Sequence, residues 1–389
     1  MLIKKTILSG LMLASSVAMA DAPLPVCHIL YDAGSSGTRL YVYEQQGTTW
    51  VEHEGPKVTA LADPVREFRG KKWQDADAVL NEVVAALDSI KQDGPVKNNK
   101  PAWKGFDWTK QCQLKSAAVY ATAGMRLAEQ SNKERSVALW ANLKQKLVTK
   151  LGEKVEVDAK TLTGFEEGLF AWLAVREQQQ NESFGIAEMG GASAQITFPC
   201  SKCEDTQPST RTIQLNGKSL KMYSYSYLGL GQDEASKSLG FPTSCINGAA
   251  TKQANWKPQD CANQIQLTAE KGVRDPYNFA GEKLGSQEQP PIEQADSNKW
   301  FLTGAFNYIN PANIETYCLK DPKLSDEEKF CYRSIYPVKY LETFKIPVDA
   351  PKLNVSWTQG AVVCKENKCL EPATKNPPFC RWLDKGCLK

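Results

Sequence analysis

Two turns rich in glycine and serine each follow a residue with a carboxylate side chain. Residues 33–38 follow Asp32, and residues 189–193 follow Glu188. Such turns present backbone N–H groups and hydroxyls on one side, a geometry that binds phosphate oxygens. A carboxylate at the preceding strand end can hold a cation opposite the phosphates, directly or through water. One such turn is weak evidence, because hairpins are often rich in glycine and serine for steric reasons, but two indicate a phosphate site.

A phosphate site that hydrolyses its ligand also needs a base to activate water. Thr163 and Glu166 are three residues apart before an apolar run, which predicts a helix N-terminus with a capping box that occupies Glu166. Glu167 points to another side of this helix, so it is the carboxylate expected to face a cleft. The structural alternative is a solvated acid in the first helical turn, where the helix dipole favours negative charge. No Walker A motif occurs, so a P-loop nucleotidase is not expected.

The elements around these residues alternate between buried strands and amphipathic helices, which predicts an α/β fold. Strand, glycine-rich turn and strand follow one another once in each half of the chain, which indicates two similar halves. The segment 242–299 is polar and irregular and is expected to be a surface insertion with cysteines. We expect strands at 26–32, 39–44, 115–120, 184–188 and 194–198, and helices at 75–92, 131–151 and 165–178.

Charge and the N-terminal segment limit the possible partners and compartments. The 389 residues carry 47 basic and 44 acidic side chains, a balance that argues against nucleic-acid binding. Residues 1–20 combine Lys4 and Lys5, an apolar run and Ala18-Met19-Ala20, as in a secretory signal, and the run is too short for a membrane anchor. The mature protein is therefore expected to be exported, either periplasmic or secreted, without a transmembrane anchor and as a monomer.

Several segments, in order along the chain, resemble the signatures of the nucleoside triphosphate diphosphohydrolase, or ecto-apyrase, family. The resemblance implies an actin-like α/β fold of two ribonuclease-H-like domains with an active-site cleft between them. It implies domains at 21–163, completed by 351–389, and at 164–350. It also implies Mg²⁺- or Ca²⁺-dependent hydrolysis of nucleoside tri- and diphosphates to monophosphates. The segments are 32–39, 121–127, 162–172 and 189–198, with looser likeness at 227–235, 300–306 and 356–361.

The resemblance also assigns roles to single residues. It makes Glu167 the general base, with Ser193, Gln195 and Thr122 as further catalytic residues and Arg126 in support. Asp32 and Glu188 would hold the metal through water, and Tyr336 and Tyr340 fall in the base-binding region. The phosphate-binding positions are Gly34, Ser35, Ser36, Gly37, Thr38, Arg39, Gly190, Gly191, Ala192 and Ser193.

Two positions depart from the family pattern, and several alternative functions stay open. Glu188 stands where the family usually has Asp, and Arg176 where it usually has Asn. An exopolyphosphatase, another actin-like phosphotransferase or an exported protein that binds nucleotides without cleaving them would share much of the pattern. For Tyr336 and Tyr340, a place in the hydrophobic core is as plausible as a place against a base.

The cysteines predict a disulfide framework, because an even number in an exported chain is typical of disulfides. In a ribonuclease-H-like domain, strands 26–32 and 115–120 would be parallel neighbours. Cys27 and Cys112 at their N-terminal ends would then lie within bridging distance. The other ten cysteines are expected to pair locally, as Cys200–Cys203, Cys245–Cys261, Cys318–Cys331, Cys364–Cys369 and Cys380–Cys387.

Overall fold

The computed structural model describes most of the chain after the predicted export signal. The signal itself, 1–20, lies outside the described residues, as do Cys318, Cys380, Cys387 and most of the predicted insertion 242–299. Within the described part, no helix is long and apolar enough to cross a bilayer. The described residues are 23–66, 73–204, 209–239, 243–245, 257–265, 267, 289–310, 314 and 329–370.

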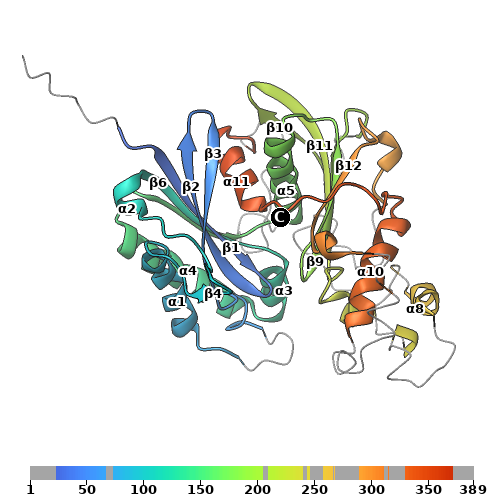
Figure 1. Ribbon diagram of the computed structural model, residues 1–389, viewed down its shortest axis with the longest axis horizontal. Helices are drawn as coiled ribbons and strands as arrows, with labels where there is room; N and C mark the ends of the chain where they lie inside the picture. Colours follow the sequence, from blue (N-terminus) through green and yellow to red (C-terminus); the bar gives the residue numbers. More distant parts are fainter. Residues whose placement is uncertain are drawn as a thin grey trace, which may run out of the picture.

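The first half of the chain forms a five-stranded sheet in the order β3-β2-β1-β6-β7 (Figure 1). Its strands are β1 (Val26–Gly34), β2 (Gly37–Gln46), β3 (Thr49–Val58), β6 (Gln113–Ala121) and β7 (Glu156–Thr161). Its helices are α1 (Ala76–Ser89), α2 (Trp108–Gln111), α3 (Ala123–Ser131) and α4 (Lys133–Leu151), and a small hairpin is formed by β4 (Val96–Lys97) and β5 (Lys100–Pro101).

Helices α1 and α4 supply apolar side chains to the core of this half. Val83 and Leu87 of α1 and Leu143 of α4 pack in one buried cluster with Ile29 of β1. The predicted helix at 131–151 begins at Lys133, because the side chain of Asn132 caps it by accepting from the N–H of Arg135 at 3.1 Å. The preceding helix, α3, was not predicted.

The second half forms another five-stranded sheet, in the order β10-β11-β9-β8-β12. Its strands are β8 (Gly185–Met189), β9 (Ser193–Pro199), β10 (Thr210–Leu215), β11 (Lys218–Leu228) and β12 (Trp300–Gly304). Its helices are α5 (Gly164–Gln179), α6 (Ala235–Ser238), α8 (Pro258–Gln264), α10 (Lys329–Thr343) and α11 (Trp357–Glu366), with short 3₁₀ turns η1 (Thr243–Cys245), η2 (Ile292–Gln294) and η3 (Ala305–Tyr308).

The two sheets repeat one topology around the two glycine-rich turns. β1 pairs antiparallel with β2 and parallel with β6. In the same way, β8 pairs antiparallel with β9 and parallel with β12. The turn between β1 and β2 is therefore equivalent to the turn between β8 and β9, as the repeated pattern in the sequence predicts.

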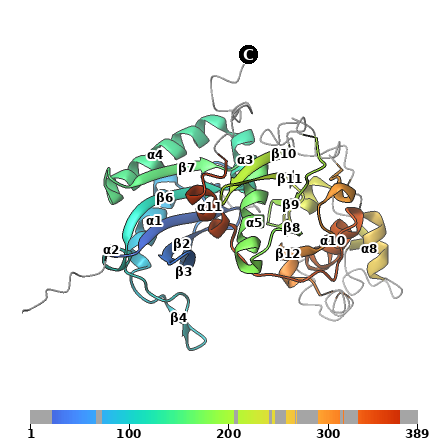
Figure 2. The same ribbon diagram turned by 90° about the horizontal axis from the view of Figure 1, so that it is seen from above.

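Helices α5 and α11 lie between the two sheets, as both ribbon views show (Figures 1 and 2). α5 is buried on all sides from Gly164 to Val175, as expected of a helix covered all round. A Cβ atom on Gly360 of α11 would stand only 1.8 Å from the carbonyl oxygen of Phe170. The backbones of the two helices are thus in direct contact, and only glycine fits at this point.

The chain crosses between the halves at two places in the described part. The first crossing is residues 161–164, where β7 ends and α5 begins. At the second, the backbone at Pro351 and Leu353 hydrogen-bonds to Leu302 of β12, and α11 then reaches the first sheet. There the hydroxyls of Thr358 and Tyr43 are 2.6 Å apart.

The disulfide prediction from parallel strands is confirmed. Cys27 and Cys112 are bonded, with Cα atoms 5.8 Å apart. The local pairs Cys200–Cys203, Cys245–Cys261 and Cys364–Cys369 are also present. Cys331 is disulfide-bonded, while its expected partner Cys318 and the pair Cys380–Cys387 lie outside the described residues.

Candidate active site

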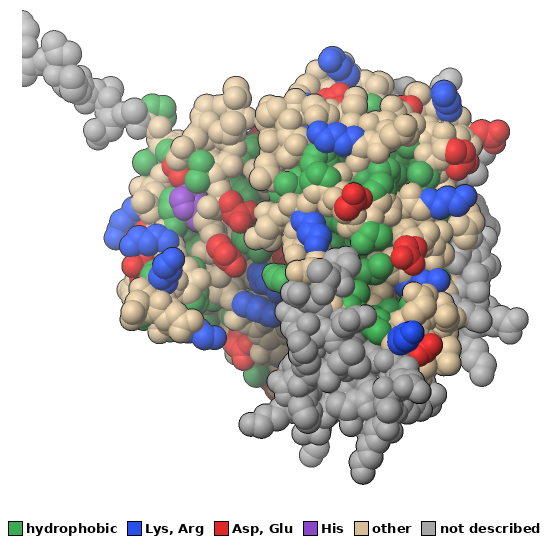
Figure 3. Space-filling model, turned by 45° about the vertical axis from the view of Figure 1, so that its right-hand side comes forward, with side chains coloured by type: hydrophobic (Ala, Val, Ile, Leu, Met, Phe, Trp, Pro, Cys, Tyr) green, Lys and Arg blue, Asp and Glu red, His purple; other side chains and the backbone are tan. Residues whose placement is uncertain are grey.

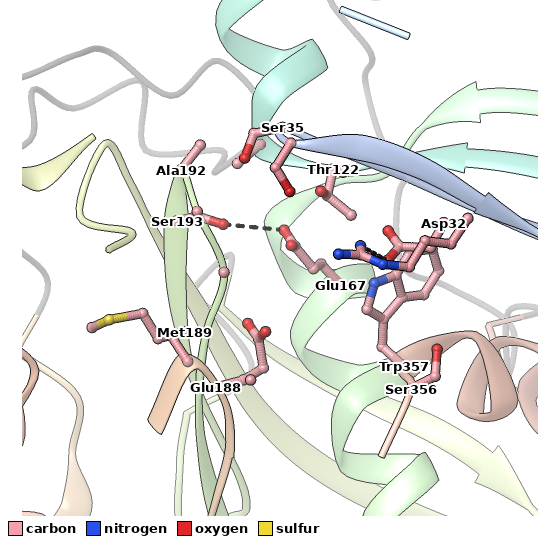
Figure 4. A pocket seen from close by; sticks show the side chains of 18 of the residues that line it. Asp32, Ser35, Thr122, Glu167, Glu188, Met189, Ala192, Ser193, Ser356 and Trp357 are labelled. Carbon is pink, nitrogen blue, oxygen red and sulfur yellow. Dashed lines mark hydrogen bonds and ion pairs between the residues drawn. The ribbon is translucent and has the colours of Figure 1, made fainter. Parts of the chain in front are cut away.

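A cavity of about 500 Å³ lies between the two sheets, at the ends of the strands that lead into the glycine-rich turns. Both turns, the first turn of α5 and the start of α3 line it. Asp32, Glu167 and Glu188 come from three different elements and project toward the same space (Figure 4). These three carboxylates were singled out in separate segments of the sequence, and the fold brings them to one place.

Most predicted phosphate positions line this cavity, but Gly37 and Thr38 do not. The backbone pairs Gly34 with Gly37, so only residues 35 and 36 form the tip of the first turn. Gly37 and Thr38 have already entered β2, where the Thr38 side chain is fully buried. The lining members of the predicted set are Gly34, Ser35, Ser36, Arg39, Gly190, Gly191, Ala192 and Ser193.

Glu166 and Glu167 face different surroundings, as the capping-box pattern predicts: Glu166 caps the helix and Glu167 faces the cavity. The Thr163 side chain accepts from the N–H of Glu166 at 3.1 Å, and Glu166 accepts from the N–H of Thr163 at 2.8 Å. Glu167 lines the cavity, and the Ser193 hydroxyl donates to its carboxylate at 3.5 Å. A carboxylate and a hydroxyl in this arrangement can hold a water molecule between them and a phosphate.

Arg126 and Gln195 lie behind this pair rather than in the cavity wall. Arg126 is fully buried; its Nη2 atom forms an ion pair with Glu167 and donates to the Ser193 hydroxyl at 3.2 Å. The amide of Gln195 donates to Ser193 at 2.7 Å and to Ser226 at 2.8 Å. Both side chains therefore orient Ser193. Thr122 does line the cavity, at the N-cap position of α3.

The surroundings of Asp32 and Glu188 disfavour the charged form of each carboxylate. Burial raises the pKa of Asp32, although the Arg39 guanidinium at 3.4 Å acts in the opposite direction. Burial, and then the charges of Glu167 and Asp32, raise the pKa of Glu188 well above its usual range. One Glu188 carboxylate oxygen is also buried without a hydrogen-bond partner. Crowded carboxylates of this kind are what a bound cation would stabilise.

The acid set fits a hydrated divalent cation better than a fully enclosed one. Among the described residues, no three His, Cys, Asp or Glu side chains are grouped so that they could enclose a metal. Mg²⁺ commonly keeps several waters and takes one or two carboxylates together with phosphate oxygens. The longer Glu188 side chain at the family's Asp position is compatible with contact through water.

Tyr336 and Tyr340 lie in the hydrophobic core, the alternative to a nucleobase site that the sequence left open. Both are fully buried in the core of the second half, and neither lines the cavity. Tyr336 donates its hydroxyl to the carbonyl oxygen of Leu230 at 2.6 Å, and Tyr340 packs against Phe344. Their spacing of four residues places them on one inward face of α10.

Several lining residues were not singled out in the sequence. Tyr308 lines the cavity with 84% of its surface exposed, so it offers a free aromatic face. Trp357 also lines it, and its side chain hydrogen-bonds to Asp32. Tyr308 lies two residues after one segment that resembles the family and Trp357 lies inside another, which is the signal that could have identified them. The others are Tyr41, Glu52, Glu54, Gln232, Asp233, Asn354 and Ser356.

Comparison with known proteins gives matches over about half of the chain. Residues 107–290 match the GDA1/CD39 (nucleoside phosphatase) family. The chain is 29% identical over 257 residues to ectonucleoside triphosphate diphosphohydrolase 8 of Gallus gallus, which covers 59% of this chain and 47% of that protein. It is 29% identical over 225 residues to probable apyrase 3 of Arabidopsis thaliana, covering 54% of this chain and 42% of that protein. Residues 107–290, just under half of the chain, thus resemble this nucleoside phosphatase family.

The fold of this protein agrees with a solved structure described as a nucleoside triphosphate hydrolase from Neospora caninum. The two share 15% identity and a TM-score of 0.51 over 87% of this chain and 91% of the other. The predicted actin-like α/β fold is confirmed. The matched segments span about half the length of the two curated relatives, and the family match contains Thr122, Glu167 and the second glycine-rich turn but not Asp32.

Proposed function

We propose that this protein hydrolyses nucleoside triphosphates and diphosphates to monophosphates and phosphate. The observation that carries the proposal is the arrangement of Glu167 and Ser193 between two equivalent glycine-rich turns, with Asp32 and Glu188 in the same cavity. A base, a water-orienting hydroxyl, phosphate-binding turns and acids for a cation are the parts that phosphoryl transfer to water requires. The match of residues 107–290 to a nucleoside phosphatase family supports this reaction class.

In the proposed mechanism, the turns bind the terminal phosphates and Glu167 activates water. Ser35, Ser36 and the N–H groups of 190–193 bind phosphate oxygens. Ser193 holds a water in line with the terminal phosphorus, and the Glu167 carboxylate accepts its proton as the oxygen attacks. Arg126 and Gln195 fix Ser193 and the base in this position. No covalent intermediate with the protein is needed.

A divalent cation, Mg²⁺ or Ca²⁺, is the proposed cofactor, and Asp32 and Glu188 are the residues that would hold it through water. When bound, it would offset charge on the phosphate oxygens. The need for such charge follows from the cavity wall, where carboxylates far outnumber cations. The acidic lining residues are Asp32, Glu52, Glu54, Glu167, Glu188 and Asp233, and the basic one is Arg39.

The nucleobase is proposed to stack on Tyr308. An exposed aromatic ring at the edge of a phosphate cavity gives a flat apolar face, and every base has a π-face that can lie against it. Broad tolerance of bases follows from this arrangement. The proposed setting is an exported, periplasmic or secreted, monomeric protein, and the disulfides support an oxidising compartment. Figure 3 shows acidic and basic side chains interspersed over one face of the molecule.

A phosphate-release assay tests the proposal directly. The purified mature protein is given ATP, ADP and polyphosphate with Mg²⁺ or Ca²⁺, and Glu167→Gln is the matched control. We expect release from ATP and ADP, and a loss of about 10²–10⁴-fold in Glu167→Gln, the usual contribution of a positioned acid–base group. Cleavage of polyphosphate alone would show an exopolyphosphatase, and nucleotide binding without release would show a binding protein.

A further inference from the structure

The carboxylate of Glu166 is shared between the start of α5 and the first sheet. One oxygen accepts from the N–H and the hydroxyl of Thr163, at 2.8 and 3.0 Å. The other oxygen accepts from the ammonium of Lys160 on β7 at 2.9 Å. The Glu166 side chain is only 9% exposed and that of Lys160 18%, so the ion pair is largely shielded from water.

A second cation faces Glu166 from the other sheet. Arg211 of β10 places its guanidinium over the Phe165 ring, 4.8 Å from the ring centre. Burial lowers the pKa of Arg211 to about 9, and the charge of Glu166 acts in the opposite direction. The carboxylate of Glu166 thus pairs with Lys160 from the first sheet, and its charge also acts on Arg211 from the second, which packs on the neighbouring Phe165.

These three side chains surround the first crossing of the chain between the halves. Lys160 is the last residue but one of β7, which ends at Thr161, and α5 begins at Gly164. Glu167, the proposed base, is the next residue after Glu166. Any change in the direction of the first turn of α5 therefore moves the Glu167 carboxylate within the cavity.

A helix cap alone does not explain the charge at position 166. Glutamine also serves at the third position of a capping box, because either side chain can accept from the cap N–H. The difference lies in the cations: with glutamine, Lys160 and Arg211 would lose the charge that acts on both. Partly buried charges that lose their partner destabilise the arrangement around them.

We infer that Glu166 is a positioning residue whose charge, shared by Lys160 and Arg211, fixes the first turn of α5 between the two sheets and so directs the Glu167 carboxylate. The inference rests on the proposed function only in taking Glu167 as the base. The capping-box spacing alone predicts only the helix cap for Glu166, and not this role in positioning Glu167.

Four proteins test it: the wild type, Glu166→Gln, Lys160→Met and the double variant. Glu166→Gln should lower kcat for ATP about tenfold, since small displacements of catalytic groups have effects of this order, with KM changed less than about twofold because the phosphate turns are untouched. Adding Lys160→Met should restore part of the lost kcat, because it removes one unshared cation. Glu177→Gln is the matched control: it breaks the 2.6 Å ion pair with Arg176 at the far end of α5 and should leave kcat unchanged.

Wild-type kcat in Glu166→Gln overturns the inference, and so does a loss that Lys160→Met does not relieve. A wild type that releases no phosphate refutes the proposed function instead. In that case urea unfolding of the same four proteins decides the matter. Charge sharing requires that the effects of Glu166→Gln and Lys160→Met on the free energy of unfolding be non-additive, and additive effects overturn it.

Discussion

Arg126 forms a fully buried ion pair with Glu167, and the same guanidinium donates to Ser193. Arg126 lies on α3 of the first half, whereas Glu167 and Ser193 lie on α5 and β9. One side chain from the first half therefore orients both the proposed base and the hydroxyl that is proposed to hold the attacking water.

Replacing Arg126 should lower activity although its side chain does not line the cavity. Arg126→Lys keeps the charge but loses the planar fork that reaches two partners, so kcat should fall about tenfold or more. Arg126→Met leaves the Glu167 carboxylate unpaired in a buried place, which destabilises folds by about 3–5 kcal/mol. Steady-state kinetics and urea unfolding check both. Equal stability of Arg126→Met and the wild type would contradict this account of the pair.

A methyl group at Gly124 should displace the first phosphate turn. Its Cβ would stand 2.7 Å from the Cα of Ser35, so the backbone of the turn would have to shift. Gly34→Ala is the control, since its Cβ would be 3.5 Å from the nearest atom, an ordinary contact. We expect Gly124→Ala to raise KM for nucleotides clearly more than Gly34→Ala does. The reverse order would mean that the turn as seen is not the phosphate-binding form.

Removal of divalent cations should abolish phosphate release. Asp32, Glu188 and Glu167 crowd negative charge where the phosphates are proposed to bind, so a nucleotide needs a cation to enter. Activity in excess chelator should be lost, and added Mg²⁺ or Ca²⁺ should restore it. Asp32→Asn should shift the metal concentration for half-maximal activity upward. Full turnover in chelator would exclude metal-dependent catalysis.

Tyr308→Ala should weaken nucleotide binding while sparing phosphate cleavage itself. Loss of one stacked base is worth about 1–3 kcal/mol, which corresponds to a rise in KM of about 5- to 150-fold. Cleavage of tripolyphosphate, which has no base, should not change. Tyr336→Ala serves as the contrast, because this buried side chain should lower the unfolding temperature instead. A tripolyphosphate defect in Tyr308→Ala would place the ring near the reaction and not under the base.

His28 should make the fold less stable in acid. Burial lowers the pKa of His28 from 6.5 to about 4, so the unfolded chain binds a proton more readily than the folded one. The stabilising contribution is complete above pH 6.5 and is lost as pH falls toward 4, by at most about 3 kcal/mol. The groups facing His28 are Ser116 and Trp50, and the charged side chains of Glu366, Lys115, Lys365 and Glu156.

The slope of stability against pH, rather than stability itself, tests this expectation. His28→Asn removes the titrating ring, so urea unfolding between pH 6.5 and 4 should show a smaller decline than in the wild type. Carboxylates that titrate in the same window affect both proteins and cancel in the comparison. Identical slopes would show that His28 does not titrate differently in the two states.

Local composition was enough to predict the two turns, the capping box and five of the strands, but not β3, β7, β10 or β11. Each depends on residues that are adjacent or evenly spaced, such as Thr163 and Glu166. The Cys27–Cys112 bridge was predictable because parallel neighbouring strands place their ends together. Gln195 and Arg126 came from the family resemblance, and their real positions behind Ser193 depend on how three elements meet.

The burial of single helix faces was not predictable, nor was the approach of segments that no strand pairing relates. Tyr336 and Tyr340 have the same spacing whether α10 turns them inward or toward a ligand, and only the packed structure shows them inside. Tyr308 and Trp357 reach the cavity from segments that the sequence separates by 49 residues, and no local pattern relates them. Helix α3 was missed because it is only nine residues long and its N-cap residue, Thr122, makes no capping hydrogen bond with its side chain.

The two crossings set the geometry that a rotation between the halves would have. Two bodies joined at two points turn about the line through those points. Glu167 lies just after the first crossing and Trp357 just after the second, so both lie close to that line. Neither crossing passes through a glycine-rich turn. A rotation about this line would therefore separate the two turns while it moved the proposed base little.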